Sequence, residues 1–468
     1  MCSKVQMTDT YYFLGIGGIG MSALARYFMA QGHRVMGYDR TPSALTYALE
    51  EEGIAIQYED CTAWVETLDK NTTLVVRTPA VPTNTTIYCY LQEHGFVMYK
   101  RAEVLGLITR QKKALCVAGT HGKTTTSTIL AHMLHPSHVG ANAFLGGIAN
   151  NYQTNLLLDT DSDYVVVEAD EFDRSFHHLV PHISVITSMD PDHLDIYGTE
   201  EAYRESFAHY ASLVQGALVV KKNIASCFSP ITSRLYTYAV GELADFYADN
   251  IRVEEGHIFF DFHTPDTQHP IPNIHMGVPI WVNIENSVAA MAVAWLVGAT
   301  EEEIRMGVST FAGVYRRFNT HVNTPQVTYI DDYAHHPQEL AATIESVRRL
   351  YPDRYVIGVF QPHLFSRTRD FADDFARVLS QLDEVALMPI YPAREEPIAG
   401  VTSEWLLEKI ADKVKRALVL PVILPKYLRE RFKSCLAAGK PVVVITMGAG
   451  DIDRQANEIT QKLTYKIL

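Results

Sequence analysis

Residues 114–126 read ALCVAGTHGKTTT, and this stretch decides the fold of the middle of a chain of 468 residues. Its apolar start predicts a strand, its two glycines predict a turn, and the residues that follow predict a helix. A strand, a glycine turn and a helix in this order form a phosphate-binding loop, because backbone N–H groups and the helix N-terminus face the anion. Lys123 can then reach the β- and γ-phosphates of a nucleoside triphosphate, and the Thr124 hydroxyl can hold Mg²⁺.

The spacing of this loop departs from the common pattern G-x-x-x-x-G-K-[ST], because Val117 stands where the first glycine would be. The loop is therefore a shorter variant. The alternative is a lysine at a glycine-containing helix start with no ligand. The run Gly-Lys-Thr-Thr-Thr between a strand and a helix favours nucleotide binding over that alternative. The predicted nucleotide-binding residues here are Gly119, Thr120, His121, Gly122, Lys123, Thr124 and Thr125.

A second glycine-rich turn lies near the N-terminus, where an apolar run at 11–14 meets GIGGIG at 15–20. A helical pattern follows, and Asp39 ends the next predicted strand. Such a turn with an acidic residue about twenty positions later is typical of dinucleotide-binding domains, but alone it is weak evidence for NAD. A hydride-transfer enzyme does not usually need a triphosphate loop as well. Two phosphate-binding turns favour one substrate that carries a phosphate and another that supplies energy; a turn that packs without a ligand stays open.

Polar side chains follow two of the predicted strands in the middle of the chain. Glu168 ends the strand in DYVVVE, and His193 follows the strand in HISVITS. Because ligands sit at the carboxyl ends of the strands in open α/β sheets, both are candidate Mg²⁺ ligands beside a triphosphate. Most of the neighbouring aspartates are predicted to be solvated. The run DDYAHHP at 331–337 fits no zinc spacing and favours contact with a substrate.

Short apolar strands alternate with helical patterns along the chain, so the predicted fold class is α/β with parallel sheets. We divide the chain into three predicted α/β domains, residues 1–110, 111–317 and 318–468. Strands are predicted in RYVIGVF, EVALMPI and PVVVITM of the third domain, and a helix is predicted at 281–298. Polar residues follow strands in every domain, which favours one composite cleft over three separate functions.

Composition and charge limit the classes of partner. The residues are 47% hydrophobic and 20% charged, which is ordinary for a globular protein. The net charge of −14 argues against non-specific binding to nucleic acid or to anionic membranes. The six cysteines contain no C-x-x-C pair, so neither a zinc site nor a disulfide framework is indicated. No apolar run approaches the ~18 residues of a membrane span, and MCSKVQMTDT lacks a signal-peptide core, so we expect a cytoplasmic protein.

The order of the motifs along the chain resembles that of the Mur ligases, ATP-dependent amide-forming enzymes of peptidoglycan precursor synthesis. The matching runs are GIGGIGMSALA, GTHGKTTTS, EADEFDRSF, DHLDIYGT, YRRF, DDYAHHPQE, QPHLFSRTRDF, YPAREEPIAGVTS and TMGAGDI. The runs DDYAHHP and QPHLFSRTRDF are particular to the branch that adds alanine. The resemblance implies a Rossmann-like UDP-binding domain, a central P-loop ATPase-type domain and a Rossmann-like C-terminal domain. It also implies ligation of L-alanine to the lactyl carboxylate of UDP-N-acetylmuramate through an acyl phosphate, with ATP as co-substrate.

The resemblance further implies roles for individual residues. The UDP part of the sugar nucleotide would be bound by Gly15, Gly17, Gly18, Gly20, Ser22 and Asp39. Two Mg²⁺ ions are implied, one bound by Thr124 and Glu168 and the other by His193. ATP would contact the loop at 119–125, and also Asn286, Arg317 and Asp332. L-Alanine and the muramoyl carboxylate would meet at His335, His336, Arg367 and Arg369. The candidate catalytic residues are Lys123, Glu168, His193, His335, Arg367 and Arg369.

Two positions depart from the family pattern. Val282 stands where a histidine is expected, although Asn283 and Asn286 are kept. A polar contact to the nucleotide base is therefore lost or supplied from elsewhere. Phe207 stands where several relatives carry a lysine that is carbamoylated in use. The alanine-adding branch tends to be apolar there, which agrees with the expected activity and leaves the second Mg²⁺ with fewer protein ligands.

Three other functions stay open from the sequence. The first is a recycling ligase that attaches a preformed tripeptide to UDP-N-acetylmuramate. The second is an NAD-dependent oxidoreductase built on the turn at 15–20, and the third is a nucleotide-binding switch without amide chemistry. For the ligase we expect small-molecule substrates only, with no nucleic acid and no membrane insertion, and either a monomer or a weak homodimer.

Overall fold

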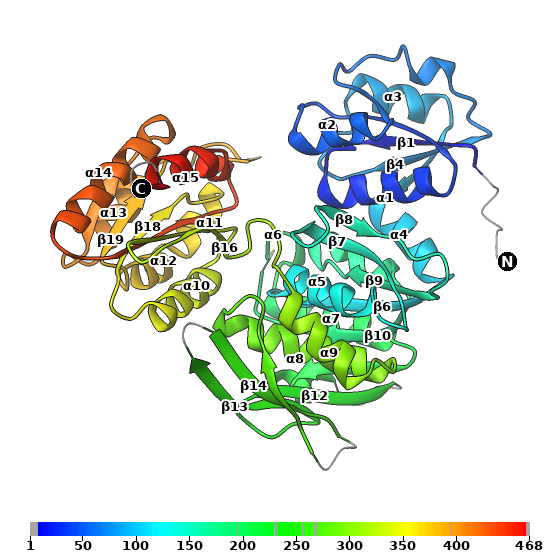
Figure 1. Ribbon diagram of the computed structural model, residues 1–468. Helices are drawn as coiled ribbons and strands as arrows, with labels where there is room; N and C mark the ends of the chain where they lie inside the picture. The colour runs from blue at the N-terminus through cyan, green and yellow to red at the C-terminus, as the bar shows by residue number, and fades with distance from the viewer. Residues whose placement is uncertain are drawn as a thin grey trace. The chain divides into compact units, whose positions relative to one another are not determined.

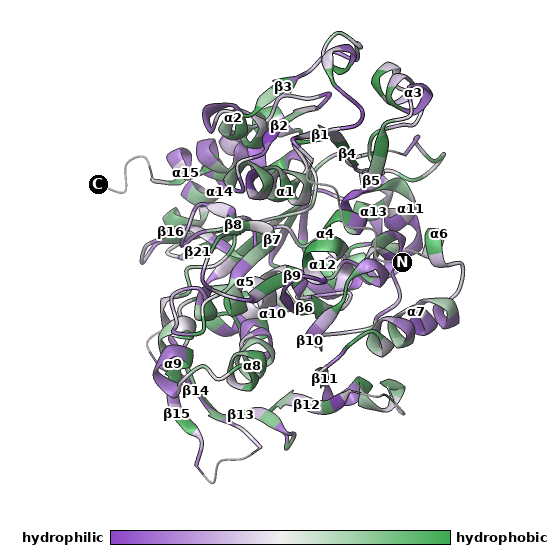
Figure 2. Ribbon diagram, turned by 90° about the vertical axis from the view of Figure 1, so that its right-hand side faces the viewer, coloured by the Kyte–Doolittle hydropathy of each residue, from purple (hydrophilic) through white to green (hydrophobic). Residues whose placement is uncertain are grey.

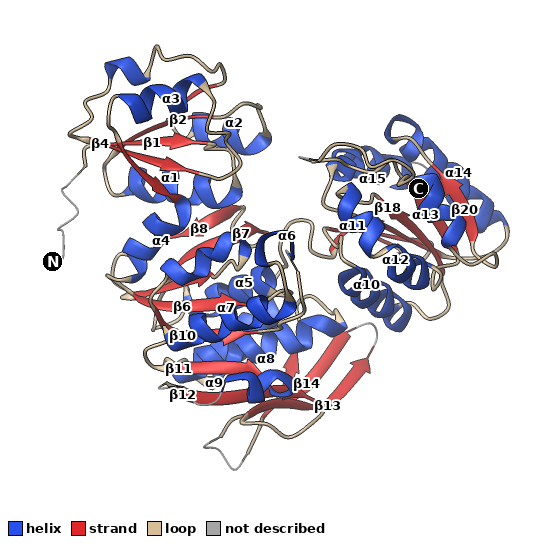
Figure 3. Ribbon diagram, turned by 180° about the vertical axis from the view of Figure 1, so that it is seen from behind, coloured by secondary structure: helices blue, strands red, loops and turns tan. Residues whose placement is uncertain are grey.

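The computed structural model describes residues 8–192, 194–228, 231, 233–254, 257–265, 269–393 and 395–464. Within these ranges the chain forms three β-sheets covered by helices (Figure 1, Figure 3), which confirms the predicted α/β class. The chain divides into two compact units. The first holds the described residues up to Gly277 together with Ile284–Ala312, and the second holds Val278–Asn283 together with the described residues from Gly313 onward.

The first sheet of the first unit is parallel and has the strand order β3-β2-β1-β4-β5. Its strands are β1 (Thr10–Leu14), β2 (Arg34–Tyr38), β3 (Ala55–Gln57), β4 (Thr73–Arg77) and β5 (Val97–Lys100). Its helices are α1 (Ile19–Ala30), α2 (Ala44–Glu51), η1 (Val65–Thr67), α3 (Thr86–Glu93) and α4 (Arg101–Thr109). Alternate residues of β1 point to opposite faces, so Tyr11 and Phe13 pack with α1 and α4 while Tyr12 and Leu14 pack with α3.

The second sheet has ten strands in the order β15-β14-β13-β12-β11-β10-β6-β9-β7-β8. The central strands are β6 (Lys113–Ala118), β9 (Tyr164–Glu168), β10 (Pro181–Ile186) and β11 (Ala217–Lys221), and these are parallel. The outer strands are β7 (Asn142–Ala149), β8 (Thr154–Leu157), β12 (Arg234–Val240), β13 (Phe246–Glu254), β14 (His257–His263) and β15 (Ile271–His275). The loop after β6 therefore opens between the carboxyl ends of β9 and β10, which carry polar residues.

The helices of this part are α5 (Lys123–Leu134), η2 (Phe172–His178), α6 (Leu194–Tyr197), α7 (Glu200–Ser212), η3 (Lys222–Phe228), α8 (Trp281–Leu296) and α9 (Glu301–Thr310). Figure 2 shows α8 mainly in hydrophobic colour and α9 more polar. Residues 288–294 of α8 are almost fully buried, which explains an apolar pattern on all sides of this helix. None of the helices in the described ranges is long and apolar enough to cross a membrane.

The second unit has a six-stranded sheet in the order β16-β17-β21-β18-β19-β20, parallel except for β16. The strands are β16 (Asn319–Asn323), β17 (Val327–Asp332), β18 (Tyr355–Phe360), β19 (Glu384–Leu387), β20 (Lys415–Leu418) and β21 (Val442–Met447). The helices are α10 (Pro337–Leu350), α11 (Phe365–Asp370), α12 (Ala372–Leu379), α13 (Ser403–Lys409), η4 (Pro421–Ile423), α14 (Leu424–Ala437), η5 (Asp451–Gln455) and α15 (Ala456–Thr464). Helices α10, α12 and α13 pack on one face of the sheet, and α14 and α15 pack on the other.

Candidate active site

The loop between β6 and α5 has a backbone that only glycine tolerates at two positions. Gly119 and Gly122 have φ of +129° and +81°, which side chains with a Cβ rarely adopt. A Cβ at Gly119 would overlap the Thr187 hydroxyl, and one at Gly122 would lie 2.7 Å from Asn286 Oδ1. The loop is thus packed closely between the end of β10 and α8.

Lys123 is the first residue of α5, and its side chain turns back toward the loop. Its Nζ donates hydrogen bonds to the carbonyl oxygens of Gly119, at 2.7 Å, and of Thr120, at 3.3 Å. The same Nζ lies 2.7 Å from Oε2 of Glu171, whose side chain is only 2% exposed. The lysine predicted to bind phosphate is therefore held by an acidic partner that the sequence analysis did not identify.

Burial and the neighbouring charges shift the pKa values of Lys123 and Glu171 in opposite directions. Burial lowers the pKa of Lys123, but the negative charges of Glu171 and Asp170 outweigh it and keep that pKa above its usual value. Burial raises the pKa of Glu171 to about 7, against the attraction of Lys123. The lysine is therefore charged at neutral pH, as a residue that binds phosphate must be.

The structure brings together Thr124 and Glu168, both predicted metal ligands. Thr124 Oγ1 donates a hydrogen bond to Glu168 Oε2 at 2.9 Å, and a Cβ at Gly146 would overlap the Glu168 carboxylate. Hydroxyl and carboxylate oxygens are ligands that Mg²⁺ prefers, so the donors fit this ion. No group of three or more His, Cys, Asp or Glu side chains suited to a metal occurs among the described residues, and His193 lies outside them.

Other loop residues are fixed by the segment after β10 and by α8. Thr120 Oγ1 donates to the carbonyl oxygen of Asp190 at 2.7 Å, and the backbone N–H of His121 donates to Ser188 Oγ at 2.9 Å. Asn286 Oδ1 accepts a hydrogen bond from Thr126 Oγ1 at 3.2 Å. The structure therefore places Asn286 beside the loop, and its contact with ATP stays a prediction.

The glycine turn at 15–20 joins β1 to α1 at the point where the strand order of the first sheet reverses, which is where α/β sheets bind ligands. The backbone N–H of Gly17 donates to Asp39 Oδ2 at 2.8 Å, and Thr41 N donates to Asp39 Oδ1 at 3.1 Å. Asp39 thus lies on the turn itself. Ser22 is fully buried and its hydroxyl bonds to Ile19 and Asn155, so it faces β8.

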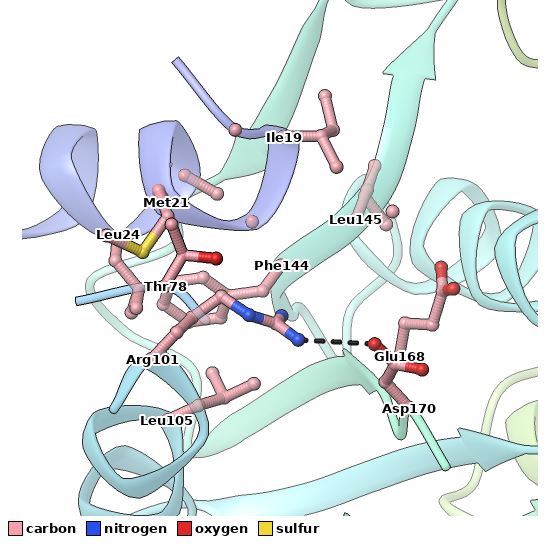
Figure 4. A pocket seen from close by; sticks show the side chains of 14 residues that line it. Ile19, Met21, Leu24, Thr78, Arg101, Leu105, Phe144, Leu145, Glu168 and Asp170 are labelled. Carbon is pink, nitrogen blue, oxygen red and sulfur yellow. Dashed lines mark hydrogen bonds and ion pairs between the residues drawn. The ribbon is translucent and has the colours of Figure 1, made fainter. Parts of the chain in front are cut away.

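A cavity of about 280 Å³ connects the glycine turn to Glu168 (Figure 4). Gly18, Gly20, Glu168 and Asp170 all line it. Figure 4 shows the Arg101 side chain extending from the side of Met21 and Leu24 toward Asp170. All of these residues belong to the first unit. A molecule bound on the turn can therefore reach the strand end that carries the predicted metal ligand.

The structure also places the two residues that depart from the family pattern. Phe207 is fully buried, and its ring centroid lies 5.2 Å from that of Phe176 and 5.1 Å from that of Tyr203. It is a core residue of α7. Val282 lies in the first turn of α8 and is 39% exposed.

In the second unit, β17, β21 and β18 are neighbouring parallel strands, so the loops after them meet at one edge of the sheet. Asp332 ends β17, is 7% exposed and accepts a hydrogen bond from Thr343 Oγ1 at 2.5 Å. The Arg317 guanidinium lies 4.9 Å from the centroid of the Tyr333 ring. Burial raises the pKa of Asp332 to about 6, although the Thr343 hydrogen bond and the charge of Arg317 oppose this.

The raised pKa of Asp332 makes stability depend on pH. The folded state holds the proton up to about pH 6, whereas an unfolded aspartate releases it near pH 4, so the contribution of Asp332 to stability falls as the pH rises between these values. The side chain in Asp332→Asn cannot ionise. As the pH rises through that range, the free energy of unfolding of this variant is therefore expected to increase by up to about 3 kcal/mol relative to that of the unsubstituted protein. Chemical unfolding of both proteins at several pH values checks this, and parallel pH profiles would contradict it.

The four residues predicted to meet L-alanine have different surroundings. His335 Nδ1 lies 3.1 Å from the carbonyl oxygen of Tyr333 and 3.3 Å from Glu339 Oε2. Burial lowers the pKa of His335; Glu339 opposes this shift and the nearby positive charge of Arg367 adds to it. His335 is therefore neutral at pH 7, with Arg367 close by.

His336 and Arg369 take part in local structure. His336 is the N-cap of α10, where its Nδ1 accepts a hydrogen bond from Gln338 N at 3.4 Å, and its ring packs against Phe371. The side chain of Arg369 is 53% exposed and pairs with Asp370 at 2.7 Å. Substrate contacts for these two residues stay predictions.

Three family models match this chain along most of its length. The Mur ligase family catalytic domain matches residues 10–113, the Mur ligase middle domain matches 117–294, and the Mur ligase glutamate ligase domain matches 316–450. These three matched segments agree with the three sheets of the structure.

Curated relatives and solved structures match over nearly the full chain. UDP-N-acetylmuramate–L-alanine ligases of Parabacteroides distasonis and Phocaeicola vulgatus are 54% and 53% identical, covering 99% of this chain and 99% and 100% of their own lengths. The crystal structure of UDP-N-acetylmuramate-alanine ligase from Thermotoga maritima is 23% identical, with a TM-score of 0.80 over 97% of this chain and 99% of that chain. A murein peptide ligase from Psychrobacter arcticus is 22% identical, with a TM-score of 0.68 over 98% and 100%. The two structures support the three-domain fold.

Proposed function

The chain belongs to the Mur ligase family, and from this we propose that it joins L-alanine to the lactyl carboxylate of UDP-N-acetylmuramate with the hydrolysis of ATP to ADP and phosphate. The observation that carries the proposal is the cavity between the glycine turn and Glu168. A sugar nucleotide with its diphosphate on the turn can extend its acid group toward the lysine loop, where the γ-phosphate of ATP would lie.

The proposed reaction first activates the carboxylate. The carboxylate oxygen attacks the γ-phosphorus of ATP, ADP leaves, and an acyl phosphate forms. The amine of L-alanine then attacks the acyl carbon, and phosphate leaves as the amide bond forms. Lys123, which donates from the base of the loop, neutralises charge that develops on the transferred phosphoryl group.

The hydrogen-bonded pair of Thr124 and Glu168 supports the proposal of a bound Mg²⁺ ion, with His193 proposed as a ligand of a second ion. Mg²⁺ at such a site neutralises charge on the phosphates. The two proposed ligands are already close together, because β9 and α5 hold the Glu168 carboxylate and the Thr124 hydroxyl within hydrogen-bond distance of each other.

Residues of the second unit are proposed to receive the amino acid. The neutral imidazole of His335 can accept the proton that the ammonium group of L-alanine must lose before it attacks. Arg367 has the fork of N–H donors that suits the alanine carboxylate. We also propose that Asn286, Arg317 and Asp332 contact ATP, and that the protein acts in the cytoplasm, where ATP is available, as a monomer or a weak homodimer.

The test of the proposal is phosphate release from ATP with UDP-N-acetylmuramate and a panel of amino acids. We expect release with L-alanine and formation of an amide product. Release with a preformed tripeptide but not with L-alanine would favour a recycling ligase. Slow ATP hydrolysis with no amide product would favour a nucleotide switch, and tight nicotinamide binding would favour an oxidoreductase.

Asp39→Ala is expected to weaken binding of the sugar nucleotide by about tenfold, because the Asp39 carboxylate holds the Gly17 and Thr41 N–H groups and so orders the turn. Binding of ATP should change little. Calorimetric titration with each ligand separately measures both effects. Equal losses for the two ligands would contradict the assignment of the turn to the sugar nucleotide.

A further inference from the structure

Arg101 is the cation whose side chain extends through the cavity between the glycine turn and Glu168. It is the first residue of α4, and Figure 4 shows its guanidinium reaching from that helix toward the acidic residues after β9. A Cβ on Gly20 would lie 2.7 Å from Arg101 Nη1, so the guanidinium also borders the turn. Arg101 therefore lies along the path from one end of the cavity to the other.

The contact that holds Arg101 leaves much of its hydrogen-bonding capacity available. Its Nη2 donates to Asp170 Oδ2 at 3.3 Å, which is long for an arginine and a carboxylate, since such pairs commonly lie at about 2.7–2.9 Å. A guanidinium has five N–H donors in a planar fork. Asp170 is itself positioned by the N–H of Phe172, which donates to its Oδ1 at 3.1 Å. Asp170 thus contacts the arginine without using all of its donors.

The lining of the cavity contains acidic side chains and one basic side chain, Arg101, among the described residues. Glu168 is proposed to bind Mg²⁺, but Asp170 lines the same space and its carboxylate would repel an incoming carboxylate. Among the described residues that line the cavity, Arg101 is the cationic one. Its neighbour Lys100 points elsewhere, because its Nζ pairs with Asp173 at 2.8 Å and Lys100 does not line the cavity.

We propose that Arg101 binds the lactyl carboxylate of the sugar nucleotide and presents one carboxylate oxygen to the γ-phosphate of ATP. This assignment rests on the proposed function. The start of α1 can receive the charge of the diphosphate end, whereas the acid end would otherwise meet Asp170, a carboxylate to which no Mg²⁺ ion is assigned. The planar fork of arginine matches a carboxylate with two parallel hydrogen bonds. Arg101 would therefore select a sugar nucleotide that carries an acid.

The test compares two ligands that differ in the acid group, UDP-N-acetylmuramate and UDP-N-acetylglucosamine. Calorimetric titration of Arg101→Met should show a loss on the order of tenfold or more in affinity for the first ligand and little change for the second. Arg101→Lys keeps the positive charge but not the planar fork of donors, and its affinity for UDP-N-acetylmuramate should fall less than that of Arg101→Met. The KM for ATP should stay unchanged in both variants.

Two variants separate this role from a structural one. Lys100→Met removes the neighbouring cation and should leave both affinities unchanged. Asp170→Asn removes the pairing charge and should keep or raise the affinity for UDP-N-acetylmuramate. Equal losses for both ligands in Arg101→Met, or a loss in Asp170→Asn as large as in Arg101→Met, would overturn the proposal. If the unsubstituted protein bound no UDP-N-acetylmuramate, the proposed function itself would fail.

Discussion

Lys123→Ala is expected to reduce kcat for L-alanine-dependent phosphate release by about a thousandfold or more. The Lys123 ammonium group lies at the base of the loop, where it donates hydrogen bonds to two loop carbonyl oxygens. From there it can neutralise the charge that develops on the transferred phosphoryl group. Loss of one well-placed donor to developing charge typically costs about 10²–10³ in rate, and here a full positive charge is lost as well. Phosphate release at saturating substrates measures the effect.

Folding must be separated from catalysis in this test, because alanine leaves Glu171 buried without its cation. The pKa of Glu171 is already raised to about 7 by burial, so we expect this carboxyl group to take up a proton and the fold to survive. The double variant Lys123→Ala/Glu171→Gln removes both charges and should match the unsubstituted protein in circular dichroism while remaining inactive. Near-normal activity in either variant would exclude the loop assignment.

The sequence predicts best the strands that are buried on both faces. The strands expected in ALCVA, RYVIGVF and PVVVITM are confirmed as β6, β18 and β21, because a parallel strand covered by helices must be apolar throughout. The antiparallel strands β13, β14 and β15 were not predicted. In β14 buried positions alternate with more exposed ones, and polar residues such as Asp249 of β13 and Asp261 of β14 interrupt the apolar pattern.

In the candidate site, the features set by neighbouring residues could be predicted from the sequence, whereas a contact between residues far apart in the sequence could not. Gly119 and Gly122 are predictable, because a turn before a helix needs them at a fixed distance from Lys123. Glu171 was not predicted as a partner of Lys123, because its run EADEFD reads as an exposed acidic loop in sequence. What buries Glu171 is packing: it is 1% exposed, and the Tyr197 hydroxyl donates to its backbone carbonyl. The contact between Lys123 and Glu171 joins two segments that are far apart in the sequence, so no local pattern of residues indicates it.

Glu171→Gln is expected to destabilise the protein by about 3 kcal/mol in the absence of nucleotide. The Lys123 side chain is 13% exposed and loses the ion pair at 2.7 Å, and removing one member of a buried ion pair is costly even though the charge of Asp170 remains nearby. Thermal melting should show a drop of several degrees in Tm. Glu200→Gln is the matched control, because Glu200 pairs with Arg204 at the surface, with side chains 46% and 57% exposed, and is expected to cost less than about 1 kcal/mol.

The same variant tests whether Glu171 and phosphate compete for Lys123. In the unsubstituted protein, part of the binding energy of a triphosphate must be used to separate Lys123 from Glu171, whereas in Glu171→Gln this ion pair is absent. A non-hydrolysable ATP analogue should therefore raise the Tm of Glu171→Gln by more than it raises the Tm of the unsubstituted protein or of Glu200→Gln. An equal or smaller rise would mean that Lys123 keeps its bond to Glu171 when nucleotide binds, and that the loop takes the phosphate through its backbone N–H groups instead.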